Sequence, residues 1–216
     1  MRMAPEYKNR SEKEILSQNI YHDAVGYGYR AASWIDYVER TGNDAAIYYA
    51  CIDGRLSIEH LIFELIVVCS EPSLTEEDYK RCLNSPRKLD KLLTQLIPEY
   101  KQLVAFSGII QSLSPGVPNI NEWDIKELMK NWGSLSSFLH WTGAPVQTSE
   151  SSEWQNEAFN KAKAVILPLW SKLSSGQSGA IRVDSMSKNT KEIWEKFRTG
   201  EIDAKAAKFR LELLGP

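Results

Sequence analysis

The chain has 216 residues, of which 43% are hydrophobic and 25% are charged, and its formal net charge is -2. These values are typical of globular proteins and exclude a disordered or fibrous chain, and the length suffices for one large domain with a small appendage. The longest apolar run, Leu61 to Cys69, contains Glu64 and is shorter than the ~20 residues that span a bilayer. The first ten residues lack the apolar stretch of a secretion signal, so we expect a cytoplasmic protein without a membrane segment.

Cysteine and histidine residues give no metal or disulfide signature. The three cysteines (Cys51, Cys69 and Cys82) lack CxxC spacing, and the three histidines are scattered along the chain. We therefore expect reduced, buried thiols, no bound metal and no cofactor. The glycine-bearing segment SSGQSGA lacks the lysine and spacing of a phosphate-binding loop, which excludes a nucleotide triphosphatase of that type.

Helical periodicity dominates the chain, and no hairpin signal accompanies it. The first predicted helix extends from Ser11 to about Arg40, and Ser11 with Glu14 forms a capping box at its beginning. Gly26 and Gly28 lie inside this helix, which indicates either a kink or the close approach of another segment.

The second predicted helix begins after Asn43 or Asp44 and ends near Ser70. Because it is apolar on nearly all sides, it is predicted to lie at the centre of a helical bundle. The remaining polar side chains form one narrow stripe, which consists of Asp53, Ser57, His60 and Glu64.

The later helices are separated by two polar segments. Helices are predicted over residues 73–83, 86–106 with a bend at Pro98, 122–141 and 153–173, with a Pro- and Gly-containing linker at 112–121 and a polar loop at 142–152. The junction at 174–189 is polar and has room for a short strand at Ala180 to Val183. We therefore predict an all-α bundle of about six main helices in residues 1–175, followed by a linker and a helical hairpin in 176–216. The turn GEID and the following KFRLELL in this C-terminal arm resemble the short helical modules called SHOCT.

Two charged residues lie among the apolar residues of the central helix. At 100° per residue, Arg55 lies about 60° and Glu59 about 20° from Ile52, on the side shared with Tyr48 and Ile66. An unpaired charge on an apolar face would cost several kcal/mol, so the two charges are predicted to pair. Their partners are each other, one helical turn apart, or groups of a neighbouring helix such as Arg30, His22 or Asp23. A buried ion pair that fixes the register of the helices is an equally good explanation.

The segment RLSIEH, from Arg55 to His60, resembles the Arg-x4-His form of the motif found in HEPN domains. Proteins of this all-α family are commonly metal-independent ribonucleases that act as homodimers, in phage-defence, toxin or RNA-processing systems. The resemblance implies that His60 transfers protons during attack of the RNA 2'-hydroxyl, that Arg55 stabilises the charge on the phosphate, and that Glu59 positions Arg55. In a straight helix Arg55 and His60 lie about 140° apart, so they converge only if Gly54 loosens the turn or a second subunit completes the site.

Three other groups of residues could form functional sites, and each also has a purely structural explanation. His22 and Asp23 are adjacent and point about 100° apart on a helix, and His140 with Trp141 fits a helix end. Six bases against two acids in residues 80–101 form a basic strip, which is suited either to RNA phosphate or to a solvated helix face.

The sequence thus supports two functions. The first is an HEPN-like protein that binds or cleaves RNA as a homodimer, with Arg55, His60 and Glu59 as the site residues. The second is a non-enzymatic helical module that binds a protein partner through its aromatic second half or its C-terminal arm.

Overall fold

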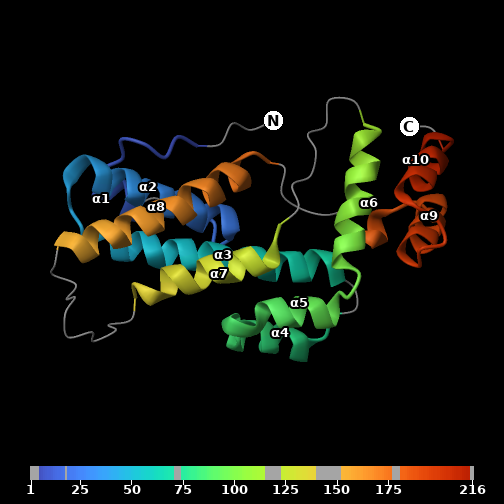
Figure 1. Ribbon diagram of the computed structural model, residues 1–216, viewed down its shortest axis with the longest axis horizontal. Helices are drawn as coiled ribbons and strands as arrows, with labels where there is room; N and C mark the ends of the chain where they lie inside the picture. Colours follow the sequence, from blue (N-terminus) through green and yellow to red (C-terminus); the bar gives the residue numbers. More distant parts are fainter. Residues whose placement is uncertain are drawn as a thin grey trace. The chain divides into compact units, whose positions relative to one another are not determined.

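The computed structural model describes residues 5–17, 19–70, 74–114, 123–139, 152–176 and 181–214. All regular structure in these residues is helical, and none of them forms a strand. The predicted all-α bundle is confirmed. The α-helices are α1 (Glu12–Ser17), α2 (Ala24–Thr41), α3 (Ala46–Ser70), α4 (Glu76–Asn84), α5 (Leu89–Leu96), α6 (Tyr100–Ser112), α7 (Ile125–Ser137), α8 (Ser152–Ser174), α9 (Lys188–Arg198) and α10 (Ala204–Glu212), and two short 3-10 helices are η1 (Pro86–Lys88) and η2 (Val183–Ser185) (Figure 1).

The chain forms two compact units, and α3 contributes to both. The first unit consists of Met1–Leu61 and Asp124–Ser175, and the second of Ile62–Trp123 and Gly176–Pro216. The division predicted from the sequence, with a bundle in residues 1–175 and a linker with a hairpin in 176–216, stays a prediction.

The first unit is built on α2, α8, α7 and the first part of α3. Helix α2 packs along α8, and α7 packs on α8 as well. Small side chains, Ala31 and Ala32 of α2 and Ala158 and Ala162 of α8, are buried completely, which allows helices to approach closely. Tyr29 of α2 packs on Trp170 of α8 with ring centroids 5.5 Å apart.

Glycine permits the tight packing of α3 in this unit. A Cβ atom at Gly54 would lie 3.0 Å from both Ile166 Cγ1 of α8 and Leu135 Cδ1 of α7. Gly54 therefore makes room for two neighbouring helices, and it lies within the continuous α3 helix. Close approach, rather than a kink, also explains Gly28, where a Cβ atom would lie 3.0 Å from Leu173 Cδ1.

The predicted single helix from Ser11 to Arg40 is wrong, because two helices, α1 and α2, occupy this segment. The capping box is present, since Ser11 N donates to Glu14 Oε2 at 2.7 Å and Glu14 N donates to Ser11 Oγ at 3.3 Å. A second cap begins α2, where the side chain of Asp23 accepts a hydrogen bond from Gly26 N at 2.7 Å. A Cβ atom at Gly26 would lie 2.0 Å from the carbonyl oxygen of Tyr21, so only glycine fits here.

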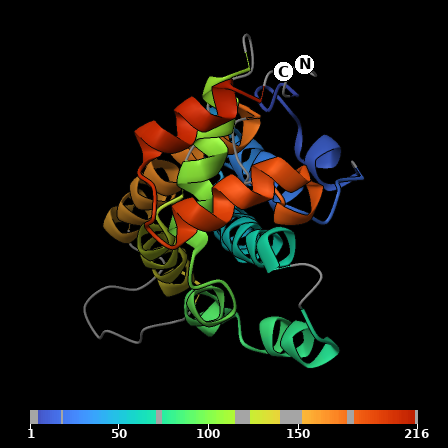
Figure 2. The ribbon, with the colours of Figure 1, turned by 90° about the vertical axis from the view of Figure 1, so that its right-hand side faces the viewer.

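The second unit has its own hydrophobic core between α6, α9 and α10 (Figure 2). Trp194 of α9 is 2% exposed, and its ring centroid lies 5.3 Å from that of Phe106 of α6. The hydroxyl of the buried Ser107 accepts a hydrogen bond from Ile181 N at 2.9 Å, which ties the segment before α9 to α6. The core comprises Leu103, Phe106, Met186, Ile193, Trp194, Ile202, Ala207 and Leu211.

Two details of the second unit differ from the prediction. The bend expected at Pro98 is a complete break, because α5 ends at Leu96 and α6 begins at Tyr100. The described part of the expected strand at Ala180 to Val183 is not a strand, since Val183 begins a 3-10 helix. The predicted linker and polar loop fall largely outside the described residues.

Candidate functional site

Arg55 and Glu59, the charged pair of the central helix, form an ion pair on the side of α3 that faces α7. Arg55 Nε lies 3.2 Å from Glu59 Oε1, which confirms the predicted pairing at one helical turn. Glu59 Oε1 also accepts a hydrogen bond from Trp132 Nε1 at 2.7 Å, and the guanidinium of Arg55 lies 5.7 Å from the centroid of the Trp132 ring. The side chains of Arg55 and Glu59 are 29% and 16% exposed, so the pair is accessible to solvent in part.

The hydrogen-bond donors of Arg55 are largely unused. The buried Nε atom makes no hydrogen bond, although it lies 3.2 Å from Glu59 Oε1. The buried Nε atom is out of reach of a ligand, so an anion could bind only at the terminal nitrogens of this partly exposed side chain.

Arg30 is bound quite differently. Its Nε donates to Asp53 Oδ2 at 2.7 Å and its Nη2 to Asp53 Oδ1 at 2.5 Å, so two nitrogens of the guanidinium bind the two oxygens of one carboxylate. Hydrogen bonding to Asp53 raises the pKa of Arg30, while burial raises the pKa of Asp53 against the opposing hydrogen bonds from Arg30. Among the predicted partners of the Arg55–Glu59 pair, Arg30 is therefore excluded.

The polar stripe of α3 faces α2. Asp53 is 3% exposed, and the fully buried Ser57 donates a hydrogen bond from its Oγ to the carbonyl oxygen of Ala24 at 2.7 Å. His60 is half-buried on the same side, and its ring centroid lies 5.0 Å from that of Tyr27.

His22, which precedes α2, joins this group through Tyr27. His22 Nδ1 and Tyr27 Oη lie 3.0 Å apart, within hydrogen-bonding distance. Burial lowers the pKa of His60, with a smaller lowering from His22, whereas Glu59 and Asp23 oppose this change. The prediction that His22 and Asp23 merely lie together in the chain overlooked the contact of His22 with Tyr27.

Arg55 and His60 are not brought together within one chain. Arg55 contacts Trp132 of α7, whereas His60 contacts Tyr27 of α2, as expected for residues about 140° apart on a regular helix. Gly54 does not loosen the turn, because it lies within the regular α3 helix. His140, the third histidine, falls outside the described residues.

The basic strip at residues 80–101 is partly neutralised. Lys80 pairs with Glu76 at 2.6 Å, and Arg81 contacts Asp78 and Gln95. The strip has the features of a solvated helix face at these two positions.

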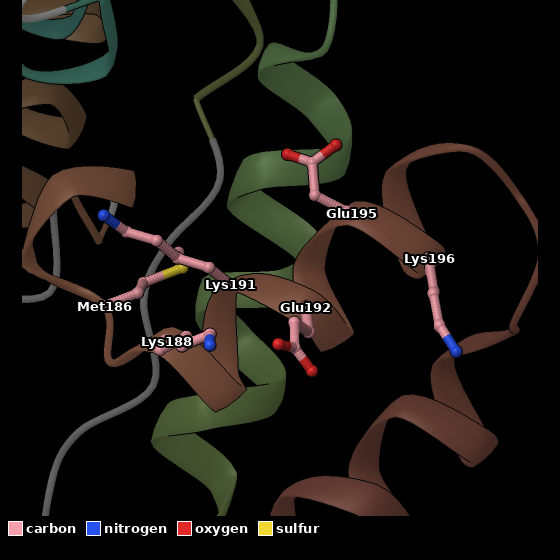
Figure 3. A pocket seen from close by; sticks show the side chains of 6 residues that line it. All are labelled: Met186, Lys188, Lys191, Glu192, Glu195 and Lys196. Atoms are coloured by element: carbon pink, nitrogen blue, oxygen red, sulfur yellow. The ribbon is translucent and has the colours of Figure 1, made fainter.

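The second unit has an open groove along α9. It has a volume of about 700 Å³ and is lined by Met186, Lys188, Lys191, Glu192, Glu195 and Lys196. Figure 3 shows these side chains projecting from α9 and the turn before it, with Lys191 beside Met186. None of the site residues predicted from the sequence lines this groove.

The thiols and the acidic residues give no further site in the described part of the chain. Cys51, Cys69 and Cys82 are free, and burial raises the pKa of Cys51 and of Cys69 to about 12, which keeps both thiols protonated. No group of three or more described His, Cys, Asp or Glu residues is arranged to hold a metal ion. No described helix combines the length and the apolar character that a membrane span requires.

Comparison with known proteins identifies no relative: no family model, no curated protein and no solved structure matches this chain.

Proposed function

We propose that this protein binds RNA and cleaves it without a metal ion, as an HEPN-like protein. The observation that carries this proposal is the position of Arg55, a partly exposed guanidinium that lies against the ring of Trp132. A guanidinium presents a planar set of donors that matches the oxygen atoms of a phosphate. Glu59 positions Arg55 and is itself held by the hydrogen bond from Trp132.

His60 is the proton-transfer residue of the proposed site. Its lowered pKa favours the neutral imidazole at neutral pH, which is the form that accepts a proton from an RNA 2'-hydroxyl. The half-buried ring is held against Tyr27, so its orientation is restricted.

The proposed active form is a homodimer. Arg55 and His60 contact different neighbouring helices of their own chain, so a phosphate bound at Arg55 requires a proton-transfer group from elsewhere. A second copy of the chain supplies it: Arg55 of one protomer acts with His60 of the partner subunit on the same phosphate.

Cleavage of a fluorescent single-stranded RNA in the presence of EDTA tests this proposal. Arg55→Ala and His60→Gln should each lower the rate by about 100-fold or more, because each removes a group that acts in the transition state. Arg198→Ala is the matched control, since Arg198 forms an exposed ion pair with Glu195 and should leave the rate unchanged. Wild-type protein that does not cut RNA would show the proposal to be wrong.

Mixing two inactive variants tests the shared site. When Arg55→Ala and His60→Gln proteins are mixed, about a quarter of wild-type activity should return, because half of randomly mixed dimers are heterodimers with one intact site of two. Absence of any recovery, with subunit exchange demonstrated, would mean that the site lies within one chain.

A second candidate function is binding of a protein partner through the C-terminal arm. Its support is the exposure of large apolar side chains on and after α10, where Phe209 is 61%, Leu213 71% and Leu214 43% exposed. Exposed apolar groups that gather on one element commonly mark interaction surfaces. A photo-cross-linking phenylalanine analogue at position 209 should then give one discrete adduct in cells, and Leu213→Ser should abolish it, while RNA cleavage is absent from the wild type.

A further inference from the structure

The rings of His22, Tyr27 and His60 lie in series in the first unit. The centroids of His22 and Tyr27 are 5.9 Å apart, and those of Tyr27 and His60 are 5.0 Å apart with an interplanar angle of 38°. The packing of α2 on α3 therefore brings two imidazoles from distant parts of the sequence into contact with one tyrosine.

The surroundings hold this cluster in place. The guanidinium of Arg30 lies 5.5 Å from the centroid of the Tyr27 ring, and Arg30 is itself fixed by its two hydrogen bonds to Asp53. The hydroxyl of Tyr27 is within hydrogen-bonding distance of His22 Nδ1. One tyrosine thus restricts the orientation of both imidazoles.

The two histidines have different environments. His22 is exposed, whereas His60 is half-buried and its pKa is lowered mainly by that burial. The charged groups that act on His60 are Glu59 of its own helix and Asp23 and His22 next to α2. Paired titratable groups whose environments differ are suited to separate roles as acid and base.

We propose that His22 and His60 form the proton-transfer pair of the RNA-cleaving site, with Tyr27 as the residue that positions His22. This inference rests on the proposed function. His60 takes the proton of the 2'-hydroxyl while the 2'-oxygen forms a bond to phosphorus, and the bond from phosphorus to the 5'-oxygen breaks. His22, as the imidazolium, gives its proton to that 5'-oxygen, so the products are a 2',3'-cyclic phosphate and a 5'-hydroxyl, and no co-reactant is consumed.

The variants His22→Gln and Tyr27→Phe test this inference, with Tyr21→Phe as the control because Tyr21 is 83% exposed. His22→Gln should lower the cleavage rate by about 100-fold, the typical effect of losing one general acid. Its affinity for an uncleavable 2'-O-methyl RNA and its thermal unfolding should match the wild type, because His22 is exposed. Tyr27→Phe should lower the rate less, and Tyr21→Phe should leave it unchanged.

The pH dependence gives a readout that a purely structural role would not change. The wild-type rate should depend on pH through its two proton-transfer groups, and His22→Gln should change the shape of this profile because it removes one of them. By NMR, the pKa of His60 should rise in His22→Gln, since the nearby imidazole lowers it in the wild type.

The possible outcomes distinguish a failure of this inference from a failure of the proposed function. If wild type cleaves RNA and His22→Gln cleaves at the same rate with the same pH profile, the role of His22 is wrong and the proposed function stands. If wild type does not cleave RNA, the proposed function and this inference both fall. An unchanged His60 titration in His22→Gln would show that the two imidazoles do not interact and would also overturn the pair.

Discussion

Arg30 of α2 binds the buried carboxylate of Asp53 of α3 through both of its side-chain oxygens, at 2.7 and 2.5 Å. Asp53 is 3% exposed, so this contact compensates a carboxylate that has left water. The ion pair connects the two helices on which the histidine cluster is built, and it therefore links the stability of the first unit to the geometry of the proposed site.

Replacement of Arg30 should destabilise the protein strongly. Arg30→Met leaves the Asp53 carboxylate buried without its partner, which should lower the free energy of unfolding by about 3 kcal/mol. The double variant Arg30→Met with Asp53→Leu should recover most of this loss, because no buried charge then remains. Urea unfolding followed by circular dichroism measures both values. Lys161→Met is the control, since Lys161 forms an exposed pair with Glu157 and should change the stability by less than about 1 kcal/mol.

Stability should fall as the pH is lowered through the range of histidine titration, and His60 should account for part of this change. The pKa of His60 is lowered in the folded state from an ordinary value of 6.5, so the unfolded chain binds more protons between the two values. Stability is therefore lost as the pH decreases below about 6.5 and is regained above it. Urea midpoints at pH 7.5 and 5.5 should differ less for His60→Gln than for the wild type, and an equal difference would contradict the lowered pKa.

The helical content and the Arg55–Glu59 pair could be predicted because both depend on local spacing. Apolar residues at helical intervals identified α3, and two opposite charges four residues apart on an apolar face required a partner. The break before α2 was not predicted. It depends on a turn that brings Gly26 against the carbonyl oxygen of Tyr21, and hydrophobic periodicity gives no information on the path of a turn.

The histidine cluster could not be predicted, since it depends on how α2 and α3 rotate against each other. That rotation follows from close contacts such as Gly28 with Leu173 and Ser57, which join three helices. One signal was present in the sequence: Asp53, Ser57 and His60 share one face of α3, and a buried face of this kind requires polar partners on a neighbouring helix. Arg30 and Tyr27, one turn or less apart on α2, were the available partners.

Substitution of Gly54 should distinguish close packing from helix flexibility. A methyl group at Gly54 would lie 3.0 Å from two fully buried side chains, Ile166 and Leu135. Gly54→Ala should therefore cost about 1–3 kcal/mol through overpacking, more than the helix propensity gained. Gly133→Ala in α7 is the matched control, because a methyl group at that position would meet nothing within 4 Å and the gain in helix propensity should stabilise the protein by up to about 1 kcal/mol. A stabilising Gly54→Ala would contradict this account of the packing.

Arg55 and Glu59 should differ in their importance for stability although they form one pair. Arg55 is 29% exposed and makes no hydrogen bond with the described residues, so Arg55→Met should change the free energy of unfolding by less than about 1 kcal/mol. Glu59→Leu removes the acceptor of the Trp132 indole as well as the charge, so its cost should be about 1–3 kcal/mol.

Urea unfolding of both variants, together with their affinity for 2'-O-methyl RNA, separates the two explanations of the charged pair. A stable Arg55→Met protein that binds RNA at least about 10-fold more weakly assigns Arg55 to the ligand, because removing a charge-assisted contact costs about 1.5–3 kcal/mol. A strongly destabilised Arg55→Met protein would instead assign the pair to the register of α3 against α7.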